Sequence, residues 1–202
     1  MLIRILIILL LLGGKLTPAL AQTFIRVGSE QDVQTPAKPG LLLAGGATDN
    51  NDAMRWLMEK AEGGDVVVIR ADQSAGYNNY LYSSLGIPVN SVTTIVISNA
   101  AAANQQSVYD AMIRAEVLFI AGGNQWNYVS HWKNTLVQDA IHYLVNEKRV
   151  AIGGTSAGLA ILGEVVFTAQ NNTVWSSEAL ENPYHFRVTL DRDFLKLPFL
   201  GE

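Results

Sequence analysis

Short runs of apolar residues alternate with amphipathic segments along most of the chain. The runs are rich in Val, Ile and Leu, which is typical of strands buried on both faces of a sheet. The predicted strands are 41–46, 65–70, 91–98, 115–123 and 150–154. Between them, apolar residues recur at helical spacing. The predicted helices are 53–64, 103–114 and 135–148. Strands that alternate with helices in this way predict an α/β domain with a parallel sheet covered on both faces.

Two stretches depart from this alternation. Residues 22–39 are polar, with scattered apolar residues and prolines near the end. They are expected to form a lead-in segment with little regular structure, and the domain itself is expected to span 40–202. Residues 71–86 carry glycine and aromatic residues without a helical or strand period, which predicts a long loop.

The N-terminus has the features of a secretory signal peptide at 1–21. Arg4 precedes an apolar run at 5–12, and Ala19 and Ala21 then form an A-x-A cleavage site. The apolar run is shorter than the ~20 residues of a membrane span. A secreted or periplasmic protein with no stable membrane anchor is therefore expected, the alternative being an uncleaved anchor.

The composition narrows the chemistry that the domain can perform. The 202 residues carry a net charge of −4, and no cluster of Lys and Arg could follow a phosphate backbone, so nucleic acid is not expected as a partner. The chain has no cysteine, which rules out disulfides, a thiolate nucleophile and cysteine-ligated zinc. Its histidines, His131, His142 and His185, lack the spacing of metal ligands. Neither a metal nor an organic cofactor is expected.

Three of the predicted strands end in a pair of glycines, at 45–46, 122–123 and 153–154. The carboxyl ends of parallel strands line one edge of a sheet, where ligands bind in this class of fold. Glycine lets a backbone turn sharply and approach a ligand closely. A site is therefore expected at this edge.

The third glycine pair leads into the sequence Gly154-x-Ser156-x-Gly158. In a nucleophile elbow the serine occupies a strained turn between a strand and a helix, and the residues two positions away must be small. The start of the following helix would place the N–H of Ala157 where it can stabilise an oxyanion. Ser156 is therefore predicted to be a nucleophile, the alternative being a turn that only needs glycine.

Three segments together resemble peptidase family S51, which includes cyanophycinase and the aspartyl dipeptidases. The sequence "GGTSAG" at 153–158 is similar to the serine motif of the family, and "AGGNQ" at 121–125 to its Gly-Gly-Asp/Asn-Gln segment. Residues 41–57 resemble its first strand, glycine turn and helix. The resemblance implies a class I glutamine amidotransferase-like fold, a three-layer α/β/α sandwich with a mostly parallel sheet. It also implies that Ser156 is the acylating nucleophile and that Gly123 supplies an oxyanion N–H beside that of Ala157.

The segment after the second glycine pair carries the expected substrate contact. On the resemblance, Gln125 would hold the substrate, since residues 122–125 leave a strand at the same edge as the serine. Alternatively, Gln125 caps the start of the next helix. Trp126 and Tyr128 are expected to pack inside the protein rather than to contact a ligand.

The base that a serine nucleophile needs is not evident. In the S51 family the histidine lies in an Asp-x-His segment followed by arginines that read the acidic group of the substrate, and no such segment is present. His185 is the only histidine after Ser156, and no carboxylate there stands out as the acid. The chain is therefore expected to be C-terminally truncated and inactive in this form, with the base and acid beyond Glu202.

The resulting expectation is a secreted serine peptidase of the cyanophycinase type. It would hydrolyse a peptide or isopeptide bond next to an aspartyl residue, in an aspartyl-containing peptide or a cyanophycin-like polymer. Two alternatives remain: a non-catalytic domain that binds a small acidic ligand, and an acyl-transferring hydrolase of another kind. A missing C-terminal part would leave apolar surface exposed and promote association, so a homodimer is a candidate assembly.

Overall fold

A six-stranded sheet forms the centre of the computed structural model, which describes residues 22–72 and 74–197. The predicted signal peptide lies outside the described residues. The strands are β1 (Gln22–Gly28), β2 (Gly40–Ala44), β3 (Asp65–Arg70), β4 (Ser91–Ile97), β5 (Val117–Ile120) and β6 (Ala151–Thr155). Their order across the sheet is β1-β4-β3-β5-β6-β2. All neighbours are parallel except β1, which is antiparallel to β4, so the predicted mostly parallel sheet is confirmed.

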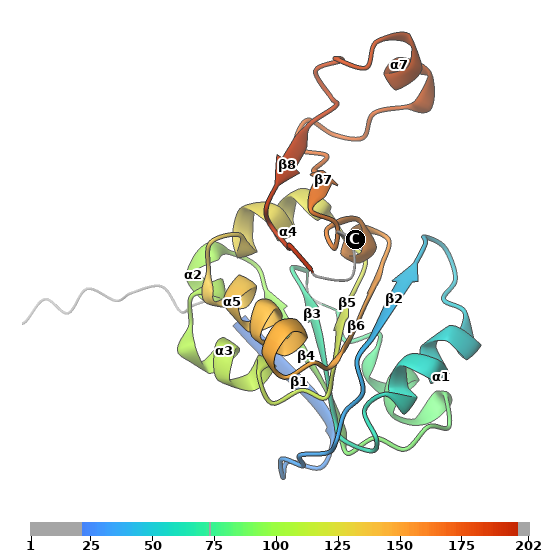
Figure 1. Cartoon of the computed structure of the whole chain (residues 1–202), viewed down its shortest axis with the longest axis vertical. Helices are drawn as coiled ribbons and strands as arrows, with labels where there is room; N and C mark the ends of the chain where they lie inside the picture. The colour runs from blue at the N-terminus through green and yellow to red at the C-terminus, as the bar shows by residue number, and fades with distance from the viewer. Residues whose placement is uncertain (1–21, 73, 198–202) are drawn as a thin grey trace, which may run out of the picture.

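Helices cover both faces of the sheet (Figure 1). The α-helices are α1 (Asn51–Glu59), α2 (Ala100–Ala103), α3 (Gln106–Met112), α4 (Gln125–Trp132), α5 (Leu136–His142), α6 (Ala157–Ala160) and α7 (Ser176–Glu181). Two further segments, η1 (Tyr80–Ser84) and η2 (Tyr143–Glu147), are π-helical. Side chains of α1 and η1 pack on one face, and those of α3, α4 and α5 on the other. The predicted α/β/α layers are confirmed.

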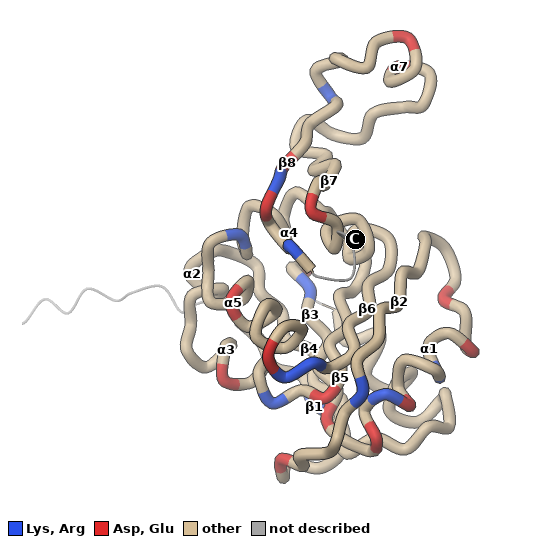
Figure 2. The backbone as a smooth tube through the Cα atoms, viewed as in Figure 1, with Lys and Arg blue, Asp and Glu red and all other residues tan. Residues whose placement is uncertain are grey.

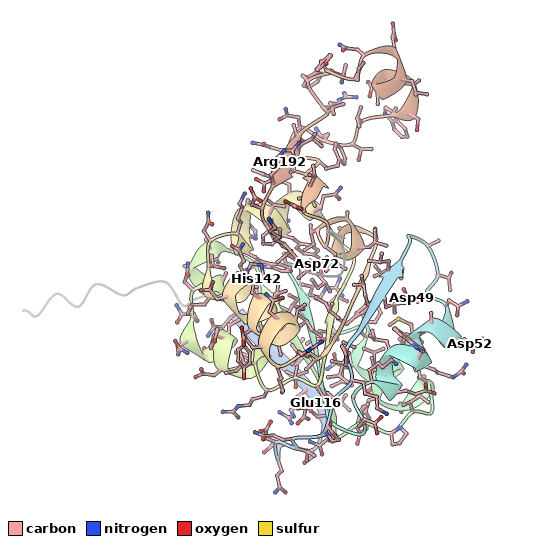
Figure 3. The ribbon with its side chains drawn as sticks, viewed as in Figure 1. Asp49, Asp52, Asp72, Glu116, His142 and Arg192 are labelled. Carbon is pink, nitrogen blue, oxygen red and sulfur yellow. The ribbon has the colours of Figure 1, made fainter. Side chains whose placement is uncertain are left out.

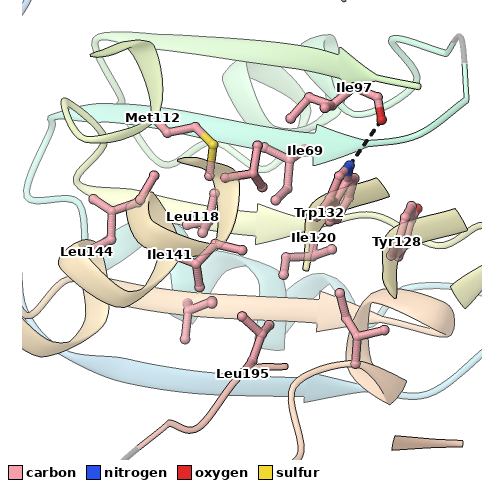
Figure 4. Packing of buried hydrophobic residues seen from close by; sticks show 14 of the residues in the cluster. Ile69, Ile97, Met112, Leu118, Ile120, Tyr128, Trp132, Ile141, Leu144 and Leu195 are labelled. Atoms are coloured by element: carbon pink, nitrogen blue, oxygen red, sulfur yellow. Dashed lines mark hydrogen bonds between the residues drawn. The ribbon is translucent and has the colours of Figure 1, made fainter. Parts of the chain in front are cut away.

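The strand β3 shows how one sheet serves two cores. Its side chains point alternately to the two faces, so Val67 and Ile69 enter one core while Val66 and Val68 enter the other. All four side chains are at most 4% exposed. Figure 4 shows the first of these cores, in which Ile69 lies among side chains of the covering helices. Because both faces are buried, the strand is apolar at every position, which is why the sequence predicted it at its observed bounds.

The expectation that residues 22–39 have little regular structure is wrong for the first of them, which form β1. This strand pairs with β4 along its whole length. Ile25 and Val27 are partly buried, whereas Phe24 and Arg26 are exposed, which is the two-residue period of an edge strand. The polar residues between the apolar ones hid β1 from a search for continuous apolar runs.

Two helical predictions are also corrected. Residues 71–86, expected to form a loop, contain η1, where Leu81 is fully buried against the α1 side of the sheet. The predicted helix over 135–148 ends as α5 at His142 and continues as the wider turn η2 to Glu147. Both segments are held by the core they cover rather than by an uninterrupted α-helical pattern.

Charged residues of both signs gather where the strands begin, at the end of the sheet opposite the carboxyl edge (Figure 2). Glu116 is fully buried there, accepts a hydrogen bond from the N–H of Asp65 at 2.8 Å and pairs with Lys148 at 2.9 Å. Burial raises the pKa of Glu116 in spite of these two interactions. Asp65 also pairs with Arg26 at 3.3 Å, so β1 is tied to the start of β3. This network of Glu116, Lys148, Asp65 and Arg26 therefore stabilises the fold at the end of the sheet away from the carboxyl edge.

After α6 the chain leaves the body as an arm, which Figure 1 shows projecting beyond the sheet. The strands β7 (Val165–Phe167) and β8 (Leu190–Arg192) pair near its base, and α7 lies at its far end. Helix α7 has no buried residue. Trp175, Leu180 and Tyr184 are 67%, 85% and 92% exposed. The arm therefore presents apolar surface to solvent.

Candidate active site

Ser156 lies at the junction between β6 and α6. Its backbone has φ 51° and ψ −117°. A positive φ is uncommon for a residue with a side chain and costs about 1–3 kcal/mol when the surrounding structure enforces it. The strained turn at the end of a parallel strand, predicted from the Gly-x-Ser-x-Gly sequence, is therefore present.

The two glycines that flank Ser156 have no room for a side chain. A Cβ on Gly154 would lie 2.5 Å from the carbonyl oxygen of Gly158. A Cβ on Gly158 would lie 2.7 Å from the carbonyl oxygen of Ala121, and closer still to that of Ile120. The glycines thus let α6 start directly against the end of β5. Gly153, in contrast, faces Leu57 and is needed for packing inside the sheet.

Backbone hydrogen bonds hold the serine turn from both sides. The N–H of Ser156 donates to the carbonyl oxygen of Ala44 at 3.2 Å, and its own carbonyl accepts from the N–H of Ala160 at 2.9 Å. The hydroxyl of Thr155 donates to the carbonyl of Gly45 at 2.9 Å. The first glycine pair therefore anchors the turn. The Ser156 side chain itself is exposed and makes no hydrogen bond with the described residues.

The second glycine pair lies beside the serine. A Cβ on Gly122 would be 3.3 Å from the Cβ of Ser156, so the loop after β5 and the turn after β6 touch at this point. Gly123 is the next residue and is exposed. The N–H groups of Gly123 and Ala157 donate no hydrogen bond within the described part of the chain. Both predicted oxyanion donors thus lie at the same edge as the serine with their protons free.

Gln125 is the first residue of α4, and it does not cap the helix. The N-cap is Asn124, whose side chain accepts from the N–H of Trp126 at 2.9 Å. The amide of Gln125 makes a long hydrogen bond of 3.4 Å to the carbonyl of Phe167, at the base of the arm. Gln125 and Gly123 line a polar cleft of about 190 Å³ together with Asn172. Ser156 is not among the residues that line this cleft, so the geometry brings Gly123 and Gln125 together more closely than it joins Gln125 to the serine.

A larger cleft of about 490 Å³ opens at the same edge, after β2 and β3. Its lining residues are Thr48, Asp49, Asn51, Arg70, Ser74, Gly76, Tyr77 and Tyr80. The Tyr77 hydroxyl donates to Asp49 at 2.8 Å, and burial together with this bond raises the pKa of Tyr77. Arg70 pairs with Asp72, which lies 3.7 Å from where a Cβ on Gly123 would be. Figure 3 shows Asp49 and Asp72 toward this edge and Glu116 at the opposite end of the sheet.

This cleft was not predicted from the sequence, because its lining residues are far apart along the chain. The signal that could have found it is positional. Arg70 ends one predicted parallel strand and Asp49 lies three residues after another, at the edge where side chains of different strands converge.

The histidines are not hydrogen-bonded to the serine in this arrangement. None of His131, His142 and His185 makes a hydrogen bond to Ser156 among the described residues. His131 and His142 each keep a buried ring nitrogen without a partner, on α4 and α5, and burial lowers the pKa of His131. The Nδ1 of His185 accepts from the N–H of Arg187 within the arm. Likewise, no group of three His, Asp or Glu side chains in the described ranges could hold a metal ion.

Comparison with known proteins shows which family the chain belongs to. The model of peptidase family S51 matches residues 41–181, which is more than half of the chain. The chain belongs to peptidase family S51. The match includes all three glycine pairs and Ser156, so the S51 segments are those that build the carboxyl edge.

Two curated relatives are the cyanophycinases of Synechococcus elongatus and Thermosynechococcus vestitus. Each is 27% identical to this chain over 139 residues, covering 64% of the chain and 43% of the relative. The chain thus spans less than half the length of these cyanophycinases. The crystal structure of a peptidase from an acI-B1 Actinobacterium has a TM-score of 0.51 at 16% identity, covering 64% of this chain and 58% of the other. This likeness supports the S51 fold. Within the described residues, no helix has the length and apolar character needed to cross a membrane.

Proposed function

We propose that this S51 member is a secreted serine peptidase of the cyanophycinase type, which hydrolyses a peptide or isopeptide bond next to an aspartyl residue. The observation that carries the proposal is the positive φ of Ser156, held between two glycines whose places no larger residue can take. Strained backbone conformations cluster at active sites and ligand-binding segments. The signal sequence at 1–21 supports secretion.

The reaction proceeds through an acyl-enzyme. Ser156 Oγ attacks the carbonyl carbon of the scissile bond while a base takes the hydroxyl proton. The N–H groups of Gly123 and Ala157 donate to the oxygen that becomes negatively charged. The C–N bond then breaks, and the amine leaves with the proton that the base had taken. Water hydrolyses the serine ester, which releases the acid product and restores the hydroxyl. No described residue is hydrogen-bonded to Ser156 Oγ, so the proposal assigns no residue as the base.

The two clefts at the carboxyl edge give the substrate its place. The larger cleft holds Arg70 and Asp49, which are able to bind a carboxylate and an ammonium group of an aspartyl peptide. The smaller cleft holds Gln125 and backbone groups around Gly123. In this proposal an aspartyl residue binds in one cleft and the leaving amine in the other.

The second candidate is a non-catalytic domain that binds a small acidic ligand in the same clefts. It is favoured by the exposed and unbonded Ser156 hydroxyl in the described residues. An acyl-transferring hydrolase with the same elbow would share the Ser156 ester and differ in the acceptor that takes the acyl group.

A fluorophosphonate probe separates these functions. We expect the protein extended to the next stop codon to be labelled at Ser156, as mapped by mass spectrometry, and to hydrolyse a β-aspartyl dipeptide or cyanophycin. Ser156→Ala should abolish both signals, whereas Ser177→Ala, a change at an exposed serine of α7, should leave them unchanged. The 202-residue chain should be nearly inactive.

Absence of labelling in the extended protein would reject both hydrolase functions and favour the binding domain. If the 202-residue chain hydrolyses as fast as the extended one, the base lies within it, and His185→Ala is the variant to test.

A further inference from the structure

The loop that carries Gly123 rests on a buried tyrosine. Tyr128, on α4, is 0% exposed, and its hydroxyl oxygen lies 2.9 Å from the carbonyl oxygens of both Ala121 and Gly122. Burial, aided by Asp72, raises the pKa of Tyr128, so the phenol is a hydrogen-bond donor at any working pH. One O–H hydrogen is thus shared between two carbonyls of the loop after β5.

The tyrosine ring is itself fixed by the core. It stacks on Trp132 with ring centroids 4.3 Å apart and an angle of 12° between the planes. Trp132 is fully buried and donates its indole N–H to the carbonyl of Ile97 at 3.0 Å (Figure 4). The Tyr128 hydroxyl is therefore held at the end of a rigid stack that reaches from β4 to the second glycine pair.

The hydrogen bond from Tyr128 to the Gly122 carbonyl also fixes the direction of the Gly123 N–H, because both belong to one planar peptide. In a planar trans peptide, the C=O of one residue and the N–H of the next point in opposite directions. With the Gly122 carbonyl turned inward to Tyr128, the N–H of Gly123 is turned away from the core. The same peptide adjoins the serine, because a Cβ on Gly122 would lie 3.3 Å from the Cβ of Ser156.

The glycine pair would not keep this orientation unaided. Glycine populates both signs of φ with little difference in energy, so a peptide between two glycines can turn over easily. A Cβ on Gly123 would lie 2.6 Å from the Tyr128 hydroxyl, so the loop lies directly on this group. The hydrogen bond and the close contact act on the same peptide.

We propose that Tyr128 is a positioning residue, which holds the Gly122–Gly123 peptide so that the Gly123 N–H faces the oxyanion of the reaction. The catalytic consequence rests on the proposed function, whereas the orientation of the loop does not. The packing role expected from the sequence is present as well, but the phenol hydroxyl adds a second role.

The test is Tyr128→Phe in the extended protein, because phenylalanine keeps the ring and its stacking on Trp132. We expect kcat to fall about tenfold with KM unchanged within about twofold, less than the about 10²–10³-fold loss on removing a whole oxyanion donor. Inhibition by an aspartyl trifluoromethyl ketone, which forms an oxyanion on the serine, should weaken by a similar factor. Binding of the uncleaved β-aspartyl dipeptide to the Ser156→Ala protein should not change when Tyr128→Phe is added.

A matched control removes another phenol hydroxyl from the same core. Tyr109→Phe, on α3, should leave kcat, KM and ketone affinity unchanged. If Tyr128→Phe leaves both kcat and ketone affinity at wild-type values, or changes KM as much as kcat, Tyr128 is not a positioning residue.

A second measurement separates this proposal from the proposed function. In the 202-residue chain labelled with ¹³C′ at Gly122 and ¹⁵N at Gly123, the Gly123 amide should give one sharp NMR signal. Tyr128→Phe should broaden or double this signal through slow peptide reorientation, and Tyr109→Phe should not. An unchanged Gly123 signal overturns the proposal even if the enzyme is active. A changed signal, together with an extended protein that neither labels nor hydrolyses, supports the loop orientation and rejects only the peptidase function.

Discussion

Gly158→Ala tests the elbow most directly. The added Cβ would lie 2.7 Å from the carbonyl oxygen of Ala121 and closer still to that of Ile120, where real Cβ contacts below 3.0 Å are essentially never seen. Neither oxygen is at the end of a flexible side chain, so α6 must move away from β5. Overpacking of this kind costs typically about 1–3 kcal/mol. Distortion of the hydrogen bond from Ile161 N–H to the Ala157 carbonyl adds about 1 kcal/mol.

A loss of about 3 kcal/mol corresponds to a melting temperature about 6–12 °C lower for a domain of this size. Movement of Ser156 by about 1 Å would also slow fluorophosphonate labelling about 10²-fold. Both are measured on the same protein, by thermal unfolding followed with circular dichroism and by labelling rate.

Gly46→Ala is the matched control for stability. It lies at the same edge, but its Cβ would meet nothing within 4 Å. We expect its stability within about 1 kcal/mol of wild type, since a Gly→Ala change without clash alters mainly the unfolded chain. A Gly158→Ala protein that melts within about 1 °C of wild type would refute the close approach of α6 to β5, and with it the reason for the glycine.

Three further predictions concern the strained serine, the buried carboxylate and the arm. Ser156→Gly should raise the unfolding free energy by about 1 kcal/mol in urea titrations, because the strain of about 1–3 kcal/mol outweighs the about 0.5–1 kcal/mol of added chain entropy; a less stable variant would contradict the strain. For Glu116→Gln, we compare the unfolding free energy of the wild type with that of the variant at each pH. The wild-type value minus the variant value should fall as the pH rises above 4.5, because the raised pKa of Glu116 makes the folded state bind the proton more strongly than the unfolded chain does. A difference that grows with pH would contradict the raised pKa. Leu180→Glu, at an 85% exposed position, should reduce self-association in light scattering without changing the melting temperature, and unaltered association would show that the arm is not the contact.

The fold was predictable where the chemistry is local. The strand β3 was predicted at its observed bounds, because a strand between two helical layers must be apolar at successive positions. The strand β1 was not predicted, since its stability comes from pairing with β4, whose partner residues lie far away in the sequence. The alternation of polar and apolar residues around Ile25 and Val27 indicates a strand only once it is known that β4 has a free edge to pair with.

The same distinction holds for the site. The turn at Ser156 was predicted because its requirements, small residues two positions away and a helix after it, lie within a few residues. The cleft with Asp49 and Arg70 depends on the order β3-β5-β6-β2 across the sheet, which no local pattern specifies. The role of Tyr128 was hidden for a further reason. Its apolar surroundings predict packing, and only the position of one hydroxyl oxygen shows that it also bonds the loop.

Ser156 has a strained backbone, whereas the Gly122–Gly123 peptide is free to turn, and hydrogen bonds fix both. The serine must be held in a backbone conformation that it disfavours. Two hydrogen bonds hold it there: its N–H donates to the carbonyl of Ala44, and its carbonyl accepts from the N–H of Ala160. The Gly122–Gly123 peptide must be kept from exploring conformations that it favours, and Tyr128 does this from the core. Both constraints come from elements buried on the sheet, none from the arm. Changes in the arm should therefore alter what approaches Ser156, while the geometry of Ser156 and of the Gly123 N–H is set by the core.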